Sequence, residues 1–259
     1  MEIFLQADTW GALITLTFLE IVLGIDNIIF ISIAANKLPE NEQKKATNIG
    51  LLLAMVLRVV LLFGISLLIA MNAPFFHIDW SWFKAGFTGQ SLILFAGGLF
   101  LLYKSTKEIH HKVDGIEAST GDENSKKEYT ISQAIIQITL INIVFSFDSI
   151  LTAVGMTNGI EGAMIIMITS VILSMIIMML FANPVGKFVN KHPSIQMLGL
   201  AFLILIGFML IAEGAHLSHA KLFGQEVGAI PKGYLYFAIT FSLIVEMLNM
   251  QIRKKKKSN

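Results

Sequence analysis

The chain has 259 residues, of which 55% are hydrophobic and only 14% are charged. This composition, with a mean hydropathy of +0.71, excludes an ordinary soluble domain and indicates a membrane protein that crosses the bilayer several times. A formal net charge of +1 does not favour a nucleic-acid partner. The lack of cysteine excludes disulfides, zinc thiolate sites and thiol nucleophiles.

Seven apolar runs are candidates for membrane helices, and the third is the shortest. The first run follows a segment that contains Glu2 and Asp8 but no Lys or Arg, so it lacks the basic start of a cleaved signal peptide and is expected to remain. We therefore expect an all-α polytopic membrane protein. The runs lie near 10–35, 48–71, 90–104, 132–156, 161–182, 195–213 and 233–252.

The sequence on the two sides of a polar segment repeats. Residues 20–28 (EIVLGIDNI) align without gaps to residues 142–150 (NIVFSFDSI), and a weaker match relates the third apolar run to the sixth. Because each repeat would hold three helices, the second would be inverted relative to the first, as in many transporters. The alternative is a chance likeness of two apolar helices, although the rare Asp at the same offset argues against it.

This interpretation predicts four segments. Residues 1–104 form the first three-helix repeat, 105–130 a flexible cytoplasmic linker, 131–219 the inverted second repeat, and 220–259 a seventh helix with a basic cytoplasmic tail.

The distribution of positive charge predicts the orientation in the membrane. With the N-terminus outside, fifteen of the nineteen Lys and Arg residues lie in inside segments, three lie outside, and Arg58 lies within a helix. The three tryptophans, Trp10, Trp80 and Trp82, then lie at the outer membrane surface, which such side chains prefer. We expect the C-terminus in the cytoplasm.

The two repeated segments place three acidic residues within apolar runs. An ionised carboxylate at the centre of a membrane helix costs roughly 2.5–3.5 kcal/mol, so Glu20, Asp26 and Asp148 together would cost on the order of 8–10 kcal/mol if nothing offset them. Such acids usually face a bundle interior or a water-filled cavity and mark an ion path. The structural alternative is a buried ion pair or a hydrogen-bonded acid that only fixes packing. Arg58 is expected to pair with Glu20 or Glu246, or to act as a mobile counter-charge.

The spacing of Glu20 and Asp26 leaves two geometries open. Six residues along an ideal helix place the two carboxylates about 120° apart and about 9 Å apart along the axis, so an intact helix cannot chelate one ion with both. Gly24 could break the helix and free carbonyl oxygens as ligands. Alternatively, the helices are continuous, and the antiparallel repeat brings Asp26 level with Asn142 and Glu20 level with Asp148.

We predict a metal site in which Asp26 and Asp148 are the anchors. Oxygen ligands suit hard divalent cations such as Mn²⁺, Ca²⁺ and Mg²⁺ rather than zinc or copper. No cofactor is expected besides the transported cation. The predicted ligands are Glu20, Asp26, Asn27, Asn142, Asp148 and Ser149.

Three segments resemble, in order, the signature regions of the TerC family of integral membrane proteins: FLEIVLGIDNIIFIS at 18–32, NIVFSFDSILTAVGM at 142–156 and IPKGYLYFAITFSLIVEMLN at 230–249. The family is named for an association with tellurite resistance, and several members are regarded as exporters of manganese. The resemblance implies a bacterial plasma-membrane Mn²⁺ exporter whose ligands are Glu20, Asp26 and Asp148, with Asn27 and Asn142 in the same site. Many relatives carry a soluble C-terminal domain, which a chain ending at Asn259 is expected to lack.

We therefore expect a secondary exporter of a divalent cation that works by alternating access between the two halves. Expelling a divalent ion costs about 4.6 kcal/mol against 100 mV. No Gly-rich nucleotide-binding motif appears in the sequence, so proton antiport is the expected energy source. The alternative is a membrane scaffold for a tellurite- or metal-resistance complex. An enzyme is not expected, because no Ser or His nucleophile with a neighbouring base lies at helix depth.

Overall fold

The structure, a computed structural model, describes residues 7–64, 73–114, 130–157, 160 and 162–258. At residues 7, 8, 23, 25–27, 148 and 254–258 it describes the helix but not the side chain. Each of the seven apolar runs overlaps a described helix. The helices are α1 (Ala7–Ala35), α2 (Glu40–Phe63), α4 (Gly89–Val113), α5 (Ile131–Thr157), α6 (Ala163–Asn190), α7 (Pro193–Leu217) and α8 (Lys232–Ser258).

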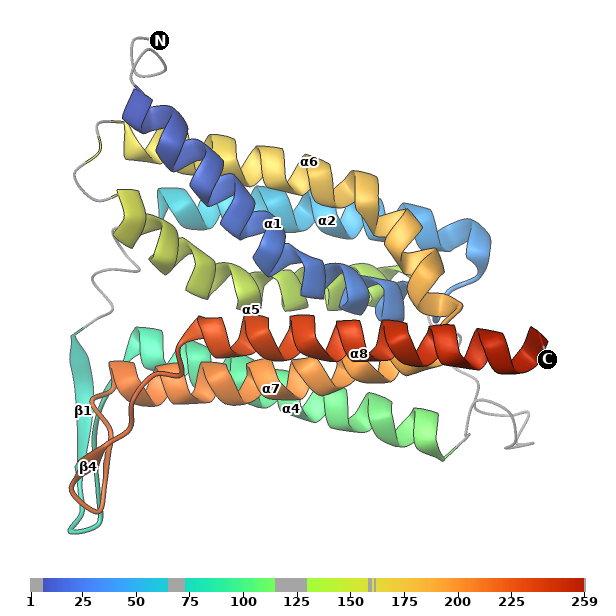
Figure 1. The fold of residues 1–259 in the computed structure, drawn as a ribbon. Helices are drawn as coiled ribbons and strands as arrows, with labels where there is room; N and C mark the ends of the chain where they lie inside the picture. Colours follow the sequence, from blue (N-terminus) through green and yellow to red (C-terminus); the bar gives the residue numbers. More distant parts are fainter. Residues whose placement is uncertain (1–6, 65–72, 115–129, 158–159, 161, 259) are drawn as a thin grey trace. The chain divides into compact units, whose positions relative to one another are not determined.

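The chain is mostly helical, as a polytopic membrane protein requires. Among the described residues, five helices are long and apolar enough to cross a membrane, namely α2, α5, α6, α7 and α8. The helices belong to two compact units. The first unit holds α1, α2, α5 and α6, and the second holds α4, α7 and α8 with four short strands (Figure 1).

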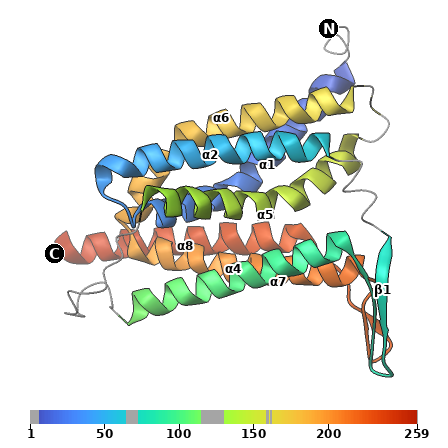
Figure 2. The ribbon, with the colours of Figure 1, turned by 180° about the vertical axis from the view of Figure 1, so that it is seen from behind.

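In the first unit, α1 and α6 lie side by side and run in the same direction (Figures 1 and 2). The residues that face each other along the two helices differ in number by 153 or 154, which is possible only for parallel helices in continuous contact. The pairs are Thr17 with Ser170, Ser32 with Gly186, and Asn36 with Asn190. Helices α2 and α5 are parallel for the same reason, because Gly50 faces Ile138 and, further along both helices, Arg58 contacts Ser149.

Glycines bring these helix pairs close together. A Cβ atom on Gly50 would lie 2.6 Å from Cγ2 of Ile138, and one on Gly186 would lie 2.8 Å from Oγ of Ser32. Small residues at the contact let the backbones of membrane helices approach, which increases van der Waals packing where lipid provides no hydrophobic driving force. The first unit is therefore held by close packing along both parallel pairs.

In the second unit, α4 and α7 are antiparallel and cross at a pair of glycines. A Cβ atom on Gly98 would lie 2.7 Å from the carbonyl oxygen of Gly207, and one on Gly207 would lie 3.0 Å from that of Gly98. Near the far end of the crossing, Nζ of Lys112 donates a hydrogen bond of 2.7 Å to Gln196. Helix α8 packs against α7.

The second unit also contains an antiparallel sheet with the strand order β1-β2-β3-β4. Strands β1 (Pro74–Asp79) and β2 (Phe83–Thr88) form a hairpin before α4, while β3 (Lys221–Leu222) and β4 (Gln225–Glu226) form one after α7. Thr88 then starts α4 with a capping box, because its hydroxyl accepts from the backbone N–H of Ser91 while the Ser91 hydroxyl accepts from that of Thr88, both at 3.0 Å.

The sheet corrects the expectation of an all-α fold. Its strands are only two to six residues long, and β2 pairs with β3 more than a hundred residues away. Short strands that depend on such a distant partner leave little local pattern in the sequence.

Two further features describe how far α4 extends and how the helices group. Helix α4 continues to Val113, into the segment expected to be linker, because residues 105–113 contain neither Gly nor Pro. Each compact unit combines helices from both expected repeats, because helices of one half pack against helices of the other.

Candidate ion-binding site

A buried ion pair lies in the first unit, midway along α1. Nη1 of Arg58, on α2, lies 2.6 Å from Oε2 of Glu20. Only 5% of Glu20 and 6% of Arg58 are exposed. An unpaired charge at such a position would cost several kcal/mol, so each residue makes the burial of the other tolerable. The expected pairing of Arg58 with Glu20 or Glu246 is confirmed for Glu20.

The same guanidinium reaches a third helix. Nη2 of Arg58 donates a hydrogen bond to Oγ of Ser149 on α5, and that hydroxyl donates in turn to the backbone carbonyl of Ser146 at 3.1 Å. We call Glu20, Arg58 and Ser149 the charged cluster. It joins α1, α2 and α5 and contains one residue from each of the two repeated segments, 20–28 and 142–150.

The hydrogen bonding of the charged cluster is incomplete. Nε of Arg58 and Oε2 of Glu20 are buried, and neither has a hydrogen-bond partner among the described residues, although Oε2 is in the ion pair. Buried polar atoms in proteins are nearly always satisfied, by protein groups or by ordered water. The cluster can therefore accept a further polar group or water molecule.

Helix α1 runs from Ala7 to Ala35 without interruption, so the alternative in which Gly24 breaks the helix is wrong. The continuous-helix alternative places Glu20 at the same depth as Asp148. Arg58 contacts both Glu20 and Ser149, the residue after Asp148, which is consistent with that depth. The Asp26, Asn27 and Asp148 side chains lie outside the described residues.

Asn142, the remaining predicted ligand, is 3% exposed on α5. Its Nδ2 donates a hydrogen bond of 3.0 Å to the carbonyl of Ile138, which fixes the amide and leaves its oxygen as a possible cation ligand. Among the described side chains, no three His, Asp or Glu residues lie close enough to hold a metal ion. The structure thus brings Glu20 and Ser149 together and describes Asn142 as a separate buried oxygen donor.

A polar cavity of 290 Å³ lies at one end of the first unit, between α1, α2 and α6. Across it the side-chain amides of Asn36 and Asn190 hydrogen-bond each other reciprocally. Helix α6 bends near this end (Figure 1), where Pro184 removes a backbone N–H from the helix. The lining includes Ser32, Asn36, Glu40, Thr47, Asn183 and Asn190.

Helix α1 contributes residues to both the cavity and the charged cluster, so the distance between the two can be measured along its axis. Ser32 is about 18 Å from Glu20 along the axis of α1, with Asp26 halfway between them. This cavity could not be predicted from the sequence, because Asn and Ser are common at the end of a membrane helix. The one available signal was Pro184 beside Asn183 at the end of an apolar run.

The sequence matches the Integral membrane protein TerC family over residues 5–259. The chain belongs to the TerC family. The TerC resemblance of the three sequence segments is thereby confirmed, and the protein is an integral membrane protein.

Similar proteins of matching length occur in bacteria. The UPF0053 protein of Haemophilus influenzae (strain ATCC 51907 / DSM 11121 / KW20 / Rd) is 40% identical over 250 residues, which are 96% of this chain and 97% of the relative. The UPF0053 inner membrane protein YgdQ of Escherichia coli (strain K12) is 43% identical over 249 residues, 96% of this chain and 95% of the relative.

The UPF0053 inner membrane protein YoaE of Escherichia coli (strain K12) is 40% identical over 255 residues, which are 98% of this chain but only 45% of that relative. The chain thus spans less than half the length of this relative. No solved structure matches the chain.

Proposed function

We propose that the protein exports a divalent cation, Mn²⁺, from the bacterial cytoplasm across the plasma membrane in exchange for protons. The observation that carries the proposal is the charged cluster, a carboxylate held by an arginine at mid-depth in a membrane bundle. Ionisable groups at this depth are costly and belong, as a rule, to ion or proton paths. Membership of the TerC family supports a membrane location, and relatives named as inner membrane proteins support the plasma membrane.

The proposed path follows α1. The cation enters at the polar cavity, passes the level of Asp26 and Asn142, and reaches the level of Glu20, Asp148 and Ser149. Asn27 completes the oxygen ligands. Carboxylate, amide and hydroxyl oxygens suit Mn²⁺, Mg²⁺ and Ca²⁺, and the choice of Mn²⁺ follows the resemblance to exporters in the family.

The proposed architecture is a pair of inverted three-helix repeats followed by a seventh membrane helix, with the N-terminus outside. Two parallel helix pairs support it. Helix α1 of the first half lies parallel to α6 of the second, and α5 of the second half lies parallel to α2 of the first. A two-fold axis in the membrane plane that relates α1 to α5 and α2 to α6 would convert one pair into the other.

In this proposal, Arg58 balances the charge of Glu20 while the cation site is empty. An arriving divalent cation competes with the guanidinium for the carboxylate. Export against a negative interior needs about 4.6 kcal/mol at 100 mV, and inward movement of protons to the vacated acids supplies it.

The test is uptake of Mn²⁺ by liposomes that contain the purified protein and carry an imposed pH gradient. We expect the wild-type protein to transport Mn²⁺, and Asp26→Asn or Asp148→Asn to lower the rate roughly tenfold or more, because each removes a charged ligand. Asp79→Asn is the matched control, since it makes the same chemical change on an exposed strand residue, and it should transport normally.

Transport that survives both Asp26→Asn and Asp148→Asn would refute the assigned site. A wild-type protein that moves no Mn²⁺ in any gradient would instead favour the alternative of a membrane scaffold. Competition by Ca²⁺ and Mg²⁺ in the same assay measures the selectivity.

A further inference from the structure

The four-stranded sheet lies across the ends of α4 and α7 rather than along them, and it extends past α4 (Figures 1 and 2). Strand β3 begins four residues after α7 ends at Leu217, and α7 is long and apolar enough to span the membrane. The sheet therefore lies at a boundary of the bilayer. No part of the proposed transport path uses it.

The strand register gives the sheet two different faces, because residues directly opposite each other in neighbouring strands share a face. One face, which we call the aromatic face, is apolar. On it Phe76 lies opposite Phe87, Ile78 opposite Ala85, and Phe83 opposite Leu222. The rings of Phe76 and Phe87 stack with their centroids 4.7 Å apart.

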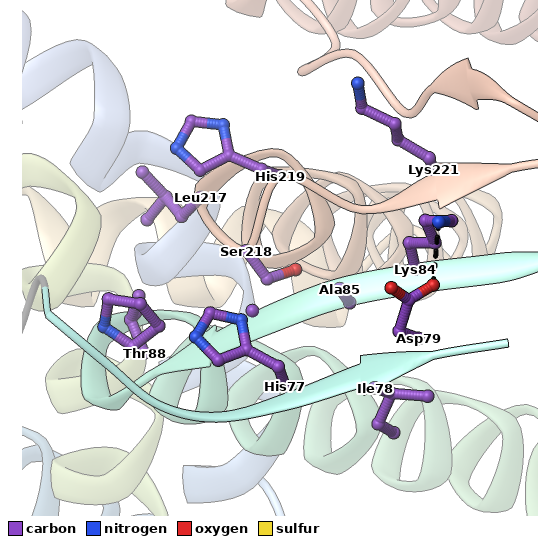
Figure 3. Close-up of a pocket in the computed structure, with 12 residues that line it drawn as sticks. His77, Ile78, Asp79, Lys84, Ala85, Thr88, Leu217, Ser218, His219 and Lys221 are labelled. Atoms are coloured by element: carbon purple, nitrogen blue, oxygen red, sulfur yellow. Dashed lines mark ion pairs between the residues drawn. The ribbon is translucent and has the colours of Figure 1, made fainter.

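The other face, which we call the polar face, carries balanced charges. On it Asp79 pairs with Lys84 at 2.7 Å and Lys221 pairs with Glu226 at 3.1 Å. The Lys221 ammonium hydrogen-bonds the exposed carboxyl of Glu226 and lowers its pKa. Figure 3 shows His77, Asp79, Lys84 and Lys221 along a cavity of 530 Å³.

The tips of the two hairpins carry a cluster of exposed rings, Trp80, Trp82 and Phe223. The ring of Trp82 lies 5.6 Å from that of Trp80 and 6.5 Å from that of Phe223. The backbone N–H of Phe223 donates to the carbonyl of Trp82 at 2.9 Å, which ties the two tips together. These side chains are exposed by 55%, 49% and 82%.

Phe223 is an unfavourable choice for the turn that it occupies. Phe223 and Gly224 have φ angles of 50° and 82°, so both central residues of the β3–β4 hairpin are left-handed, as a type I′ turn requires. Asn-Gly is the favoured pair at such a turn, and an aromatic residue with positive φ is uncommon. Since the ring is also 82% exposed, neither the turn nor internal packing accounts for it.

The aromatic face is turned toward the side of the sheet on which the helices run. Phe87 on this face contacts Phe95 in the second turn of α4, with ring centroids 6.0 Å apart. Where the sheet extends past α4, the same face is directed into the region beside the helix.

We propose that the sheet is a membrane-surface anchor, which lies flat on the bilayer with its aromatic face and the Trp80, Trp82 and Phe223 rings at the level of the lipid headgroups and upper acyl chains. Tryptophan and other amphipathic rings concentrate at that level. The polar face is in water. In the proposed topology this is the external leaflet.

The charge on the polar face also indicates whether the anchor needs anionic lipid. Each of its lysines is paired with a carboxylate, so the anchor depends on apolar burial and needs no anionic lipid. We expect it to bind in vesicles of phosphatidylcholine alone.

The test uses tryptophan fluorescence, because the chain has only three tryptophans. In the variant Trp10→Phe/Trp80→Phe, Trp82 is the single reporter. We compare this protein in liposomes of phosphatidylcholine and of phosphatidylcholine brominated near the top of the acyl chains. We expect the brominated lipid to quench Trp82 strongly.

The matched control places the reporter on the polar face a few residues away. The variant Trp10→Phe/Trp80→Phe/Trp82→Phe/Asp79→Trp changes an exposed residue of β1, and we expect its emission to be quenched by aqueous iodide rather than by the brominated lipid. Equal lipid quenching at both positions overturns the proposal. Trp82 emission that is quenched only by iodide also overturns it. Blue-shifted Trp82 emission that neither reagent quenches overturns it too, because a protein partner would then cover the tip.

Phe223→Asn in the single-Trp82 protein is a second variant that favours the turn. We expect it to fold normally by circular dichroism but to weaken quenching by the brominated lipid, since one ring of the anchor is lost. Unchanged quenching contradicts a role for Phe223 in the anchor. These measurements report the position of a ring and are independent of Mn²⁺ transport.

Discussion

The side chain of Arg58 contacts two helices at once. Nη1 contacts Glu20 on α1, while Nη2 contacts Ser149 on α5. A planar guanidinium can make both contacts at once, whereas the single ammonium of a lysine cannot hold the same geometry. The charged cluster therefore depends on arginine and not only on a positive charge.

A double-mutant cycle at Arg58 and Glu20 measures this dependence. Removing one partner of a buried ion pair leaves an uncompensated charge, so Arg58→Gln alone should lower the free energy of unfolding by about 3–5 kcal/mol. Glu20→Gln/Arg58→Gln removes both charges and should recover most of that loss. Unfolding in detergent micelles, followed by circular dichroism, is the measurement, and strictly additive losses would show that the two residues do not interact.

At the residue scale, rarity made the buried ion pair predictable. Glu20 and Arg58 stand out because charges are uncommon in apolar runs, and the repeat drew attention to Ser149. The exact partner of Arg58 was left between Glu20 and Glu246, because helix periodicity does not tell which helices pack together. The Asn36–Asn190 pair could not be predicted from the sequence, since each is an ordinary polar residue near a helix end.

Helices α4 and α7 are held at close range by glycine. Each of Gly98 and Gly207 leaves room for the other's backbone carbonyl, and a carbonyl cannot move aside as a flexible side chain can. The contact therefore sets the distance between the two helix axes.

We expect Gly98→Ala to destabilise the protein by about 1–3 kcal/mol, the usual cost of overpacking, because the new methyl group would force α4 and α7 apart. Gly155→Ala is the control, a glycine in the last turn of α5 with nothing within 4 Å of the added Cβ atom. There alanine should be neutral or stabilise by up to about 1 kcal/mol through helix propensity. Thermal unfolding of the two variants compares them, and equal losses would exclude the close contact as the cause.

At the element scale, long apolar periodicity made the helices predictable, while their ends and the sheet were not. The polar end of α4 was assigned to a linker because composition alone cannot separate a helix that leaves the membrane from a loop. The strands were missed because they are only two to six residues long and because β2 pairs with β3 more than a hundred residues away.

For the whole molecule, the proposed orientation can be tested directly because the native chain contains no cysteine. Single cysteines at Ser81, in the turn of the β1–β2 hairpin, and at Asn41, in the first turn of α2, are both exposed. In intact cells, a membrane-impermeant maleimide should label Ser81→Cys and not Asn41→Cys. The reverse pattern would place the N-terminus inside and invert the direction of the proposed path.

The sheet also limits where the molecule can move. Strand β2 precedes α4 and strand β3 follows α7, yet their backbones are paired, and the N–H of Gly86 donates to the carbonyl of Ser218 at 2.8 Å. Separating α4 from α7 would break this backbone pairing and the glycine contact together. The second unit is thus suited to be a rigid frame. A repeated motion costs less free energy in the first unit. Helix α6 can bend at Pro184, and the Asn36–Asn190 amide pair can exchange its hydrogen bonds for hydrogen bonds to water.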